Sequence, residues 1–90
     1  MKYTVIWNPS AIADLARIWA AALDRAAVTA ASDAIDHSLC VDPILRGETY
    51  RGLTRVVLER PLIITYRVTD DDRMVQVLTV ERLPDDNSRN

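Results

Sequence analysis

The chain divides into two blocks of different composition, and this division constrains its fold more than any other feature. All eleven alanines fall between Ala11 and Ala34, whereas all but one of the runs rich in β-branched residues follow Leu53. Alanine has the highest helix propensity, and valine, isoleucine and threonine favour strands. We therefore predict an α+β fold in which a helical block precedes a strand block, with one further strand in front.

The length and composition predict a single folded domain. The 90 residues are 49% hydrophobic and 27% charged, which is typical of a folded chain rather than a disordered one. We expect residues 1–84 to form this domain and the polar residues 85–90 to form a disordered tail. The apolar run near the N-terminus is too short for a signal segment or a membrane span, so we expect a cytoplasmic location and no membrane partner.

The N-terminal half predicts a strand and a helical hairpin. Residues 3–7 are β-branched and aromatic, and Asn8-Pro9 ends this strand and begins a helix. The apolar residues of the first helix recur at helical spacing, and we expect this face to be buried: Ile12, Leu15, Trp19 and Leu23. A second helix over residues 28–41 ends before Pro43. Its apolar face consists of Val28, Ala31, Ile35 and Leu39.

The C-terminal half predicts three strands, over residues 53–59, 62–68 and 74–81. A connector over residues 44–52, which contains both glycines, precedes them. Because the strands are short and sequential, a β-meander is the simplest arrangement. The predicted fold is β-α-α-β-β-β, with the helical hairpin packed on one face of a mainly antiparallel sheet.

Side-chain alternation predicts which face of the meander the helices cover. A three-residue connection over residues 59–61 places an almost purely apolar set on the covered face: Val56, Leu58, Leu62, Ile64, Tyr66, Val68, Met74, Gln76, Leu78 and Val80. A two-residue connection would place Arg55 and Glu59 there instead. With the first register, four aliphatic residues lie among charges on the open face: Val57, Ile63, Val75 and Val77. Either the C-terminal tail covers part of this face or a partner does.

Four arginines are candidate contacts to a target or to phosphate: Arg51, Arg55, Arg67 and Arg82. We expect Arg55 and Arg67 to share the open face, with Arg51 before the first strand of the meander and Arg82 at the end of the last. Guanidinium groups bind phosphate and carboxylate oxygens, although the net charge of −2 fits nucleic acid poorly. The alternative is a set of solvated arginines paired with Glu48, Glu59 or Glu81.

The composition excludes several kinds of site. The chain has two glycines, one cysteine and one histidine, which excludes a glycine-rich phosphate loop, an internal disulfide and a thiolate zinc site. We expect no metal and no cofactor. We expect His37 to be a solvated helix residue, and Trp7 and Trp19 to belong to the core.

The order of several short motifs resembles the RelE/ParE toxin superfamily. These motifs are an alanine-rich hairpin ending in Leu39-Cys-Val-Asp-Pro43, then Arg51-Gly-Leu53, Ile64-Thr-Tyr-Arg-Val68, an acidic turn, and Val75-Gln-Val-Leu-Thr-Val-Glu-Arg82. The resemblance extends over residues 3–83 and implies a toxin of a bacterial type II toxin–antitoxin module, held inactive by a cognate antitoxin. We assign the expected antitoxin contacts to the aliphatic residues of the open face: Val57, Ile63, Val75 and Val77.

The resemblance implies one of two activities. ParE-like members inhibit DNA gyrase by protein contact, and RelE-like members cleave mRNA on the ribosome. The RelE-like branch has an arginine at the position of Ile63 and lysines near positions 54–56, where only Arg55 is basic in this chain. It also has a tyrosine or histidine after the position of Arg82, where this chain has neither. The proton-transfer groups are thus missing, and we favour the ParE-like mode without enzyme activity. The alternatives are a RelE-like mRNA endonuclease and a degenerate, non-toxic binding protein; a homodimer is left open.

Overall fold

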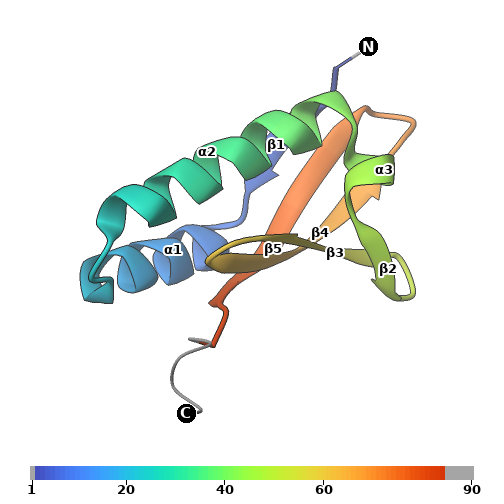
Figure 1. The fold of residues 1–90 in the computed structure, drawn as a ribbon. Helices are drawn as coiled ribbons and strands as arrows, with labels where there is room; N and C mark the ends of the chain where they lie inside the picture. Colours follow the sequence, from blue (N-terminus) through green and yellow to red (C-terminus); the bar gives the residue numbers. More distant parts are fainter. Residues whose placement is uncertain (1, 85–90) are drawn as a thin grey trace.

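The computed structural model describes residues 2–84 and has two layers, a helical hairpin on one face of a five-stranded sheet (Figure 1). In chain order the elements are β1 (Thr4–Trp7), α1 (Pro9–Ala21), α2 (Arg25–Val41), α3 (Pro43–Arg46), β2 (Glu48–Arg51), β3 (Thr54–Glu59), β4 (Leu62–Thr69) and β5 (Met74–Arg82). The strand order is β1-β5-β4-β3-β2, with β1 parallel to β5 and the other pairs antiparallel. The predicted α+β class and its helix-on-sheet arrangement are confirmed. The predicted tail at 85–90 lies outside the described residues.

Helix α2 packs as the sequence predicts. The Asp24 side chain accepts a hydrogen bond from the backbone N–H of Ala27 at 3.1 Å and so caps the first turn. The predicted apolar face at positions 28, 31, 35 and 39 is buried in the core. The helix ends at Val41, because the residue before Pro43 avoids helical backbone angles. No helix within the described residues is long and apolar enough to cross a membrane.

Helix α1 buries a different face from the predicted one. Ala11 is fully buried, and Leu15 packs against the core beside it. Ile12 is 55% exposed, Trp19 42% and Leu23 102%, so the predicted burial of these three residues is wrong. The small side chain of Ala11 allows α1 to approach the sheet closely, and Ile12 and Trp19 then face the outer surface of the hairpin.

The β3–β4 hairpin has a two-residue turn, so the predicted register of β3 is wrong. Glu59 lies directly opposite Leu62, which leaves only two residues between the strands. A difference of one residue moves every side chain of β3 to the other face of the sheet. Val57 is therefore in the core, and Leu58 is 49% exposed on the open face, the sheet face turned away from the helices.

A β-bulge reverses the predicted faces of the first half of β5. Between the paired segments of β4 and β5, Leu78 is an extra residue on β5 without a partner on β4. As a result Val75 and Val77 are fully buried under the helices, whereas Gln76 is exposed. The prediction had these three residues on the opposite faces.

The elements α3 and β2 lie in a connector for which the sequence predicts no strand. Strand β2 pairs with β3 at the edge of the sheet, and all four of its residues are exposed. A short edge strand with no buried face lacks the apolar alternation on which strand prediction rests. This additional strand lengthens one end of the sheet without changing the fold class.

Side chains tie β1 to the turn between β4 and β5. The Tyr3 hydroxyl donates to Asp70 Oδ1 at 2.5 Å, and the Arg73 guanidinium lies 5.4 Å from the centre of the Tyr3 ring. The hydrogen bond to Asp70 raises the pKa of the Tyr3 hydroxyl above its ordinary value. The acidic turn thus secures the edge strand β1 in addition to its backbone hydrogen bonds with β5.

Candidate functional site

The open face holds a row of polar side chains that crosses the sheet. Arg51 on β2 and Arg67 on β4 both lie opposite Thr54 on β3. Directly opposed residues share a face, and two strand spacings place the two arginine Cα atoms about 10 Å apart. Both arginines are exposed, and neither forms an ion pair within residues 2–84. We call Arg51, Thr54 and Arg67 the arginine row.

The other two candidate arginines do not join this row. Arg55 lies opposite the buried Tyr66, so its side chain is on the helix-facing side of the sheet. The prediction that Arg55 and Arg67 share the open face is wrong, because the two-residue turn reverses β3. Arg82 is exposed at the end of β5, opposite the buried Leu62. The structure therefore brings together two of the four predicted contact residues.

Arg55 instead fixes the connector that leads into the arginine row. Its Nη2 donates to the carbonyl oxygens of Ile44 at 2.5 Å and Gly47 at 2.7 Å, and its Nη1 donates to Thr49 Oγ1 at 3.4 Å. Its Nε is buried without a hydrogen-bond partner. Because a guanidinium carries five N–H donors in a rigid plane, one arginine can hold several carbonyl groups at once. Arg55 is thus a positioning residue for α3 and β2.

Tyr66 supports the same connector from within the core. Its buried hydroxyl donates to the carbonyl oxygen of Pro43 at 2.6 Å. Gly47 lies so close to the sheet that an added Cβ would be 2.1 Å from the Tyr66 hydroxyl and 2.7 Å from the Val56 carbonyl oxygen. Only a residue without a side chain fits in this space. The chain from α3 to β2 is therefore held against the sheet by two neighbouring side chains, Arg55 and Tyr66.

Three of the four predicted antitoxin contacts lie in the core. Val57, Val75 and Val77 are at most 4% exposed and belong to the cluster beneath the helices. Their predicted placement on the open face is wrong, because the turn has two residues and β5 has a bulge. Ile63 is on the open face as predicted, opposite Leu58. The open face remains partly apolar through a different set of residues: Ile6, Val56, Leu58 and Ile63.

Two hollows on the outer surface of the helical hairpin join into one groove. The hollow between α1 and α2 has a volume of about 270 Å³ and is lined by Ile12, Leu15, Ala16, Trp19, Val28, Thr29 and Ser32. The second, of about 490 Å³, shares Leu15 and Ser32 with the first and continues to Trp7. We call this continuous surface the helix groove. The sequence does not indicate this groove, because the helical spacing of Ile12 and Trp19 predicts that both are buried.

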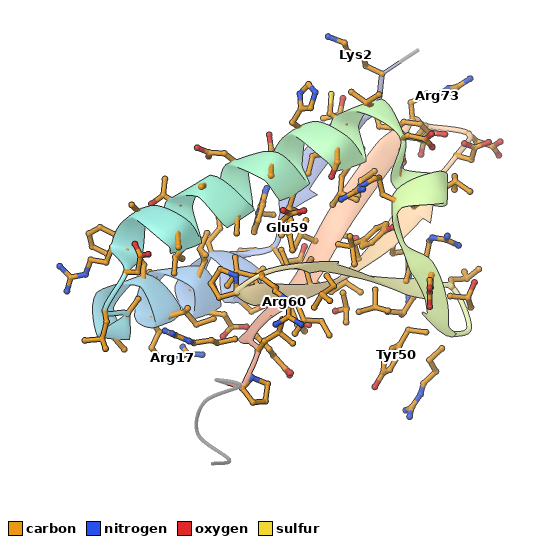
Figure 2. All side chains as sticks on the ribbon, viewed as in Figure 1. Lys2, Arg17, Tyr50, Glu59, Arg60 and Arg73 are labelled. Atoms are coloured by element: carbon orange, nitrogen blue, oxygen red, sulfur yellow. The ribbon has the colours of Figure 1, made fainter. Side chains whose placement is uncertain are left out.

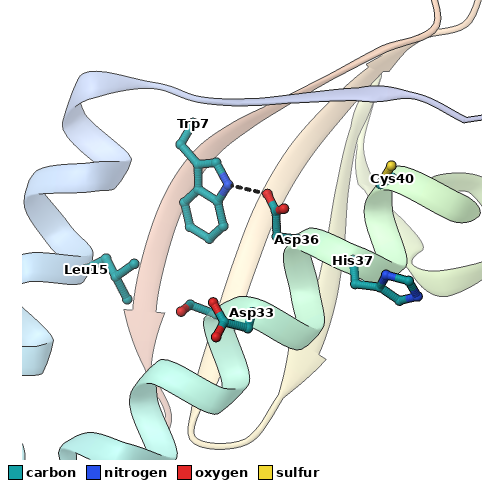
Figure 3. A pocket seen from close by; sticks show the side chains of 7 residues that line it. Trp7, Leu15, Asp33, Asp36, His37 and Cys40 are labelled. Atoms are coloured by element: carbon teal, nitrogen blue, oxygen red, sulfur yellow. Dashed lines mark hydrogen bonds between the residues drawn. The ribbon is translucent and has the colours of Figure 1, made fainter.

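The two ends of the helix groove carry opposite charges. At one end the indole N–H of Trp7 donates to Asp36 at 3.0 Å, and Asp33 lines the same hollow (Figure 3). At the other end the Arg25 guanidinium lies 4.6 Å from the centre of the Trp19 ring and donates to two carbonyls of the last turn of α1. A complementary segment would be apolar in its middle and basic where it meets Asp33 and Asp36.

The open face carries few groups for acid–base chemistry near the arginine row. The single histidine, His37, is exposed on α2, as predicted, and not on the sheet. Glu59 is in an ion pair with Arg46 at 3.3 Å. Glu48, at the start of β2, is the carboxylate next to the row, and phosphodiester cleavage needs both a general base and a general acid. Within residues 2–84 no group of three His, Cys, Asp or Glu side chains could hold a metal ion.

Comparison with protein families gives one match over most of the chain. The family described as "ParE toxin of type II toxin-antitoxin system, parDE" matches residues 5–82. A search of the curated proteins finds none that matches. The family match extends from within β1 to the end of β5.

Several solved structures share the fold. The toxin–antitoxin complex RelBE2 from Mycobacterium tuberculosis is 22% identical with a TM-score of 0.77, and the match covers 91% of this chain and 99% of that one. The chromosomal ParDE system from P. aeruginosa is 21% identical with a TM-score of 0.66, over 91% and 97% of the two chains. An archaeal RelE–RelB complex from Pyrococcus horikoshii OT3 is 16% identical with a TM-score of 0.66, over 91% and 96%.

Proposed function

The chain belongs to the ParE toxin family of type II toxin–antitoxin systems, and on this premise we propose that it stops growth by binding DNA gyrase rather than by cutting RNA. The observation that carries this proposal is the arginine row, two exposed guanidinium groups that have no ion-pair partner within residues 2–84. Such groups are suited to carboxylates on a large protein partner. With one neighbouring carboxylate and no histidine on the sheet, the row is better suited to binding than to cleavage.

We also propose that a cognate antitoxin occupies the helix groove. Ile12 and Trp19 expose apolar surface there, and contiguous exposed apolar surface is typical of a binding site. Two of the similar structures are toxin–antitoxin complexes, which supports a partner of this kind. The groove suits an amphipathic segment with a basic residue near Asp33 and Asp36. Ile63 remains a proposed contact on the open face.

Expression of the chain without its antitoxin is expected to slow growth and to induce a DNA-damage response, because a poisoned gyrase leaves DNA breaks. Culture density and a damage-responsive reporter measure the two effects, and primer extension on translated mRNAs is run in parallel. Site-specific cuts in mRNA would favour the RelE-like endonuclease instead. Normal growth at confirmed expression would identify a degenerate, non-toxic binding protein.

Arg67→Ala is expected to raise the concentration needed for half-inhibition of gyrase about tenfold or more, because interface arginines are often hot spots. Arg82→Ala is the matched control, since Arg82 is also exposed but lies away from the arginine row. Neither change should alter thermal stability by more than about 0.5 kcal/mol. An equal effect of the two substitutions on inhibition would contradict the role of the arginine row.

A further inference from the structure

The hairpin between β2 and β3 ends in an exposed apolar tip, residues 50–53. Tyr50 is 60% exposed and Leu53 75%, and Figure 2 shows Tyr50 pointing away from the body of the protein. Gly52 has a φ of +56°, which a glycine adopts readily and which reverses the chain at this point. The tip therefore presents a large aromatic and a large aliphatic side chain to solvent on a tight turn.

The tip stands on a firmly held base. The guanidinium of Arg55 bonds to the Ile44 and Gly47 carbonyls and reaches Thr49, the residue next to Tyr50. Gly47 also packs against the hydroxyl of Tyr66, which lies beside Arg55 on the same face of the sheet. A hairpin whose base is fixed in this way loses less conformational entropy when it binds than a free loop does. These contacts keep the apolar side chains of Tyr50 and Leu53 exposed to solvent. Polar residues at these two positions would leave the core undisturbed.

The chemistry of the tip suits a protein surface. The Arg51 guanidinium lies 5.7 Å from the centre of the Tyr50 ring, and the next charged side chain along the arginine row is Arg67. Tyrosine and arginine are among the residue types enriched at interface hot spots. Arg51 and Arg67 form no ion pair with any residue that the structure describes, so they favour carboxylates on the partner, and Leu53 favours an apolar pocket. An aliphatic side chain gains little from phosphates or bases, and the chain as a whole has a net charge of −2, so nucleic acid is the poorer fit.

We propose that the β2–β3 tip inserts Tyr50 and Leu53 into an apolar pocket rimmed by carboxylates on the protein target. This inference rests on the proposed function, and it adds the tip to the arginine row as the surface that meets the target. The tip lies at the opposite end of the protein from the turn between α1 and α2 (Figure 1). Loss of the tip should therefore weaken target inhibition without affecting binding in the helix groove.

The test compares the double variant Tyr50→Ser/Leu53→Ser with Leu23→Ser. Leu23 is 102% exposed in the turn between the helices, so its replacement removes a fully exposed leucine at the other end of the molecule. We measure growth arrest on expression, inhibition of supercoiling by purified gyrase, and neutralisation by the co-expressed antitoxin. Thermal unfolding, with Leu53→Ser alone as a second variant, checks that the fold is retained.

The double variant is expected to lose growth arrest and to need about tenfold or more protein to inhibit gyrase, while Leu23→Ser behaves as the unchanged chain. Undiminished arrest by a folded double variant would overturn the inference. Tip-dependent binding of a labelled DNA or RNA oligonucleotide in the absence of gyrase would overturn the assignment to a protein target. If the unchanged chain arrests growth without inhibiting gyrase, the proposed function fails, and loss of arrest in the double variant still supports the tip as the target contact.

Discussion

Ile12→Glu is expected to release the chain from its antitoxin while leaving its toxicity intact. Ile12 is 55% exposed in the helix groove, so glutamate can be placed there without disturbing the core, and glutamate is a good helix former. In the complex, however, the carboxylate would be buried against an apolar segment without a partner. Burial of an unpaired charge typically costs more than 2 kcal/mol, which is about thirtyfold or more in affinity.

Growth with both proteins co-expressed, and titration of the two purified proteins, measure this effect. Leu23→Glu is the matched control, because Leu23 is exposed just beyond the groove and does not line it. We expect the antitoxin to neutralise Leu23→Glu as it neutralises the unchanged chain. Full neutralisation of Ile12→Glu, with unchanged affinity, would show that the antitoxin binds elsewhere.

Gly47→Ala is expected to destabilise the protein strongly, and far more than the same substitution at Gly52, the other glycine. The new Cβ would lie 2.1 Å from the Tyr66 hydroxyl and 2.7 Å from a backbone oxygen of β3, so either the connector or the core must move. Overpacking of this kind costs about 3 kcal/mol, and the buried bond from Tyr66 to Pro43 is at risk as well. For a domain of this size we expect the melting temperature to fall by about 10 °C or more.

Gly52→Ala provides the comparison for this effect. At Gly52 no atom lies within 4 Å of the added Cβ, and the φ of +56° is the only obstacle, which costs about 1 kcal/mol. Tyr66→Phe combined with Gly47→Ala should recover only part of the loss, because the contact with the Val56 carbonyl oxygen remains. Similar melting temperatures for the two alanine variants would contradict the close packing of the connector.

The sequence predicts the broad fold because its two compositional blocks are local signals. Helix α2 is the clearest case, since its four predicted apolar positions are all buried and Pro43 marks its end. The register of the sheet, by contrast, is not determined by the composition of each segment. It depends on one residue in the β3–β4 turn and on the bulge at Leu78, and either choice leaves an apolar alternation in the strands.

The candidate site could be predicted only in part for the same reason. Arg51 and Arg67 come together because both lie opposite Thr54, which no spacing along the chain indicates. Alternation with a three-residue turn predicts Arg55 on the open face, but the actual register turns it toward the connector carbonyls. The helix groove cannot be predicted from the sequence, because periodicity identifies an apolar face of a helix without showing whether another element covers that face.

Inhibition of purified DNA gyrase by the purified chain tests the central claim most directly. The assay follows supercoiling of relaxed plasmid by gyrase with increasing amounts of the chain. We expect supercoiling to fall with the amount of chain added and to recover when the antitoxin is supplied. Undisturbed supercoiling at every concentration, with a folded chain that still arrests growth in cells, would contradict the claim that gyrase is the target.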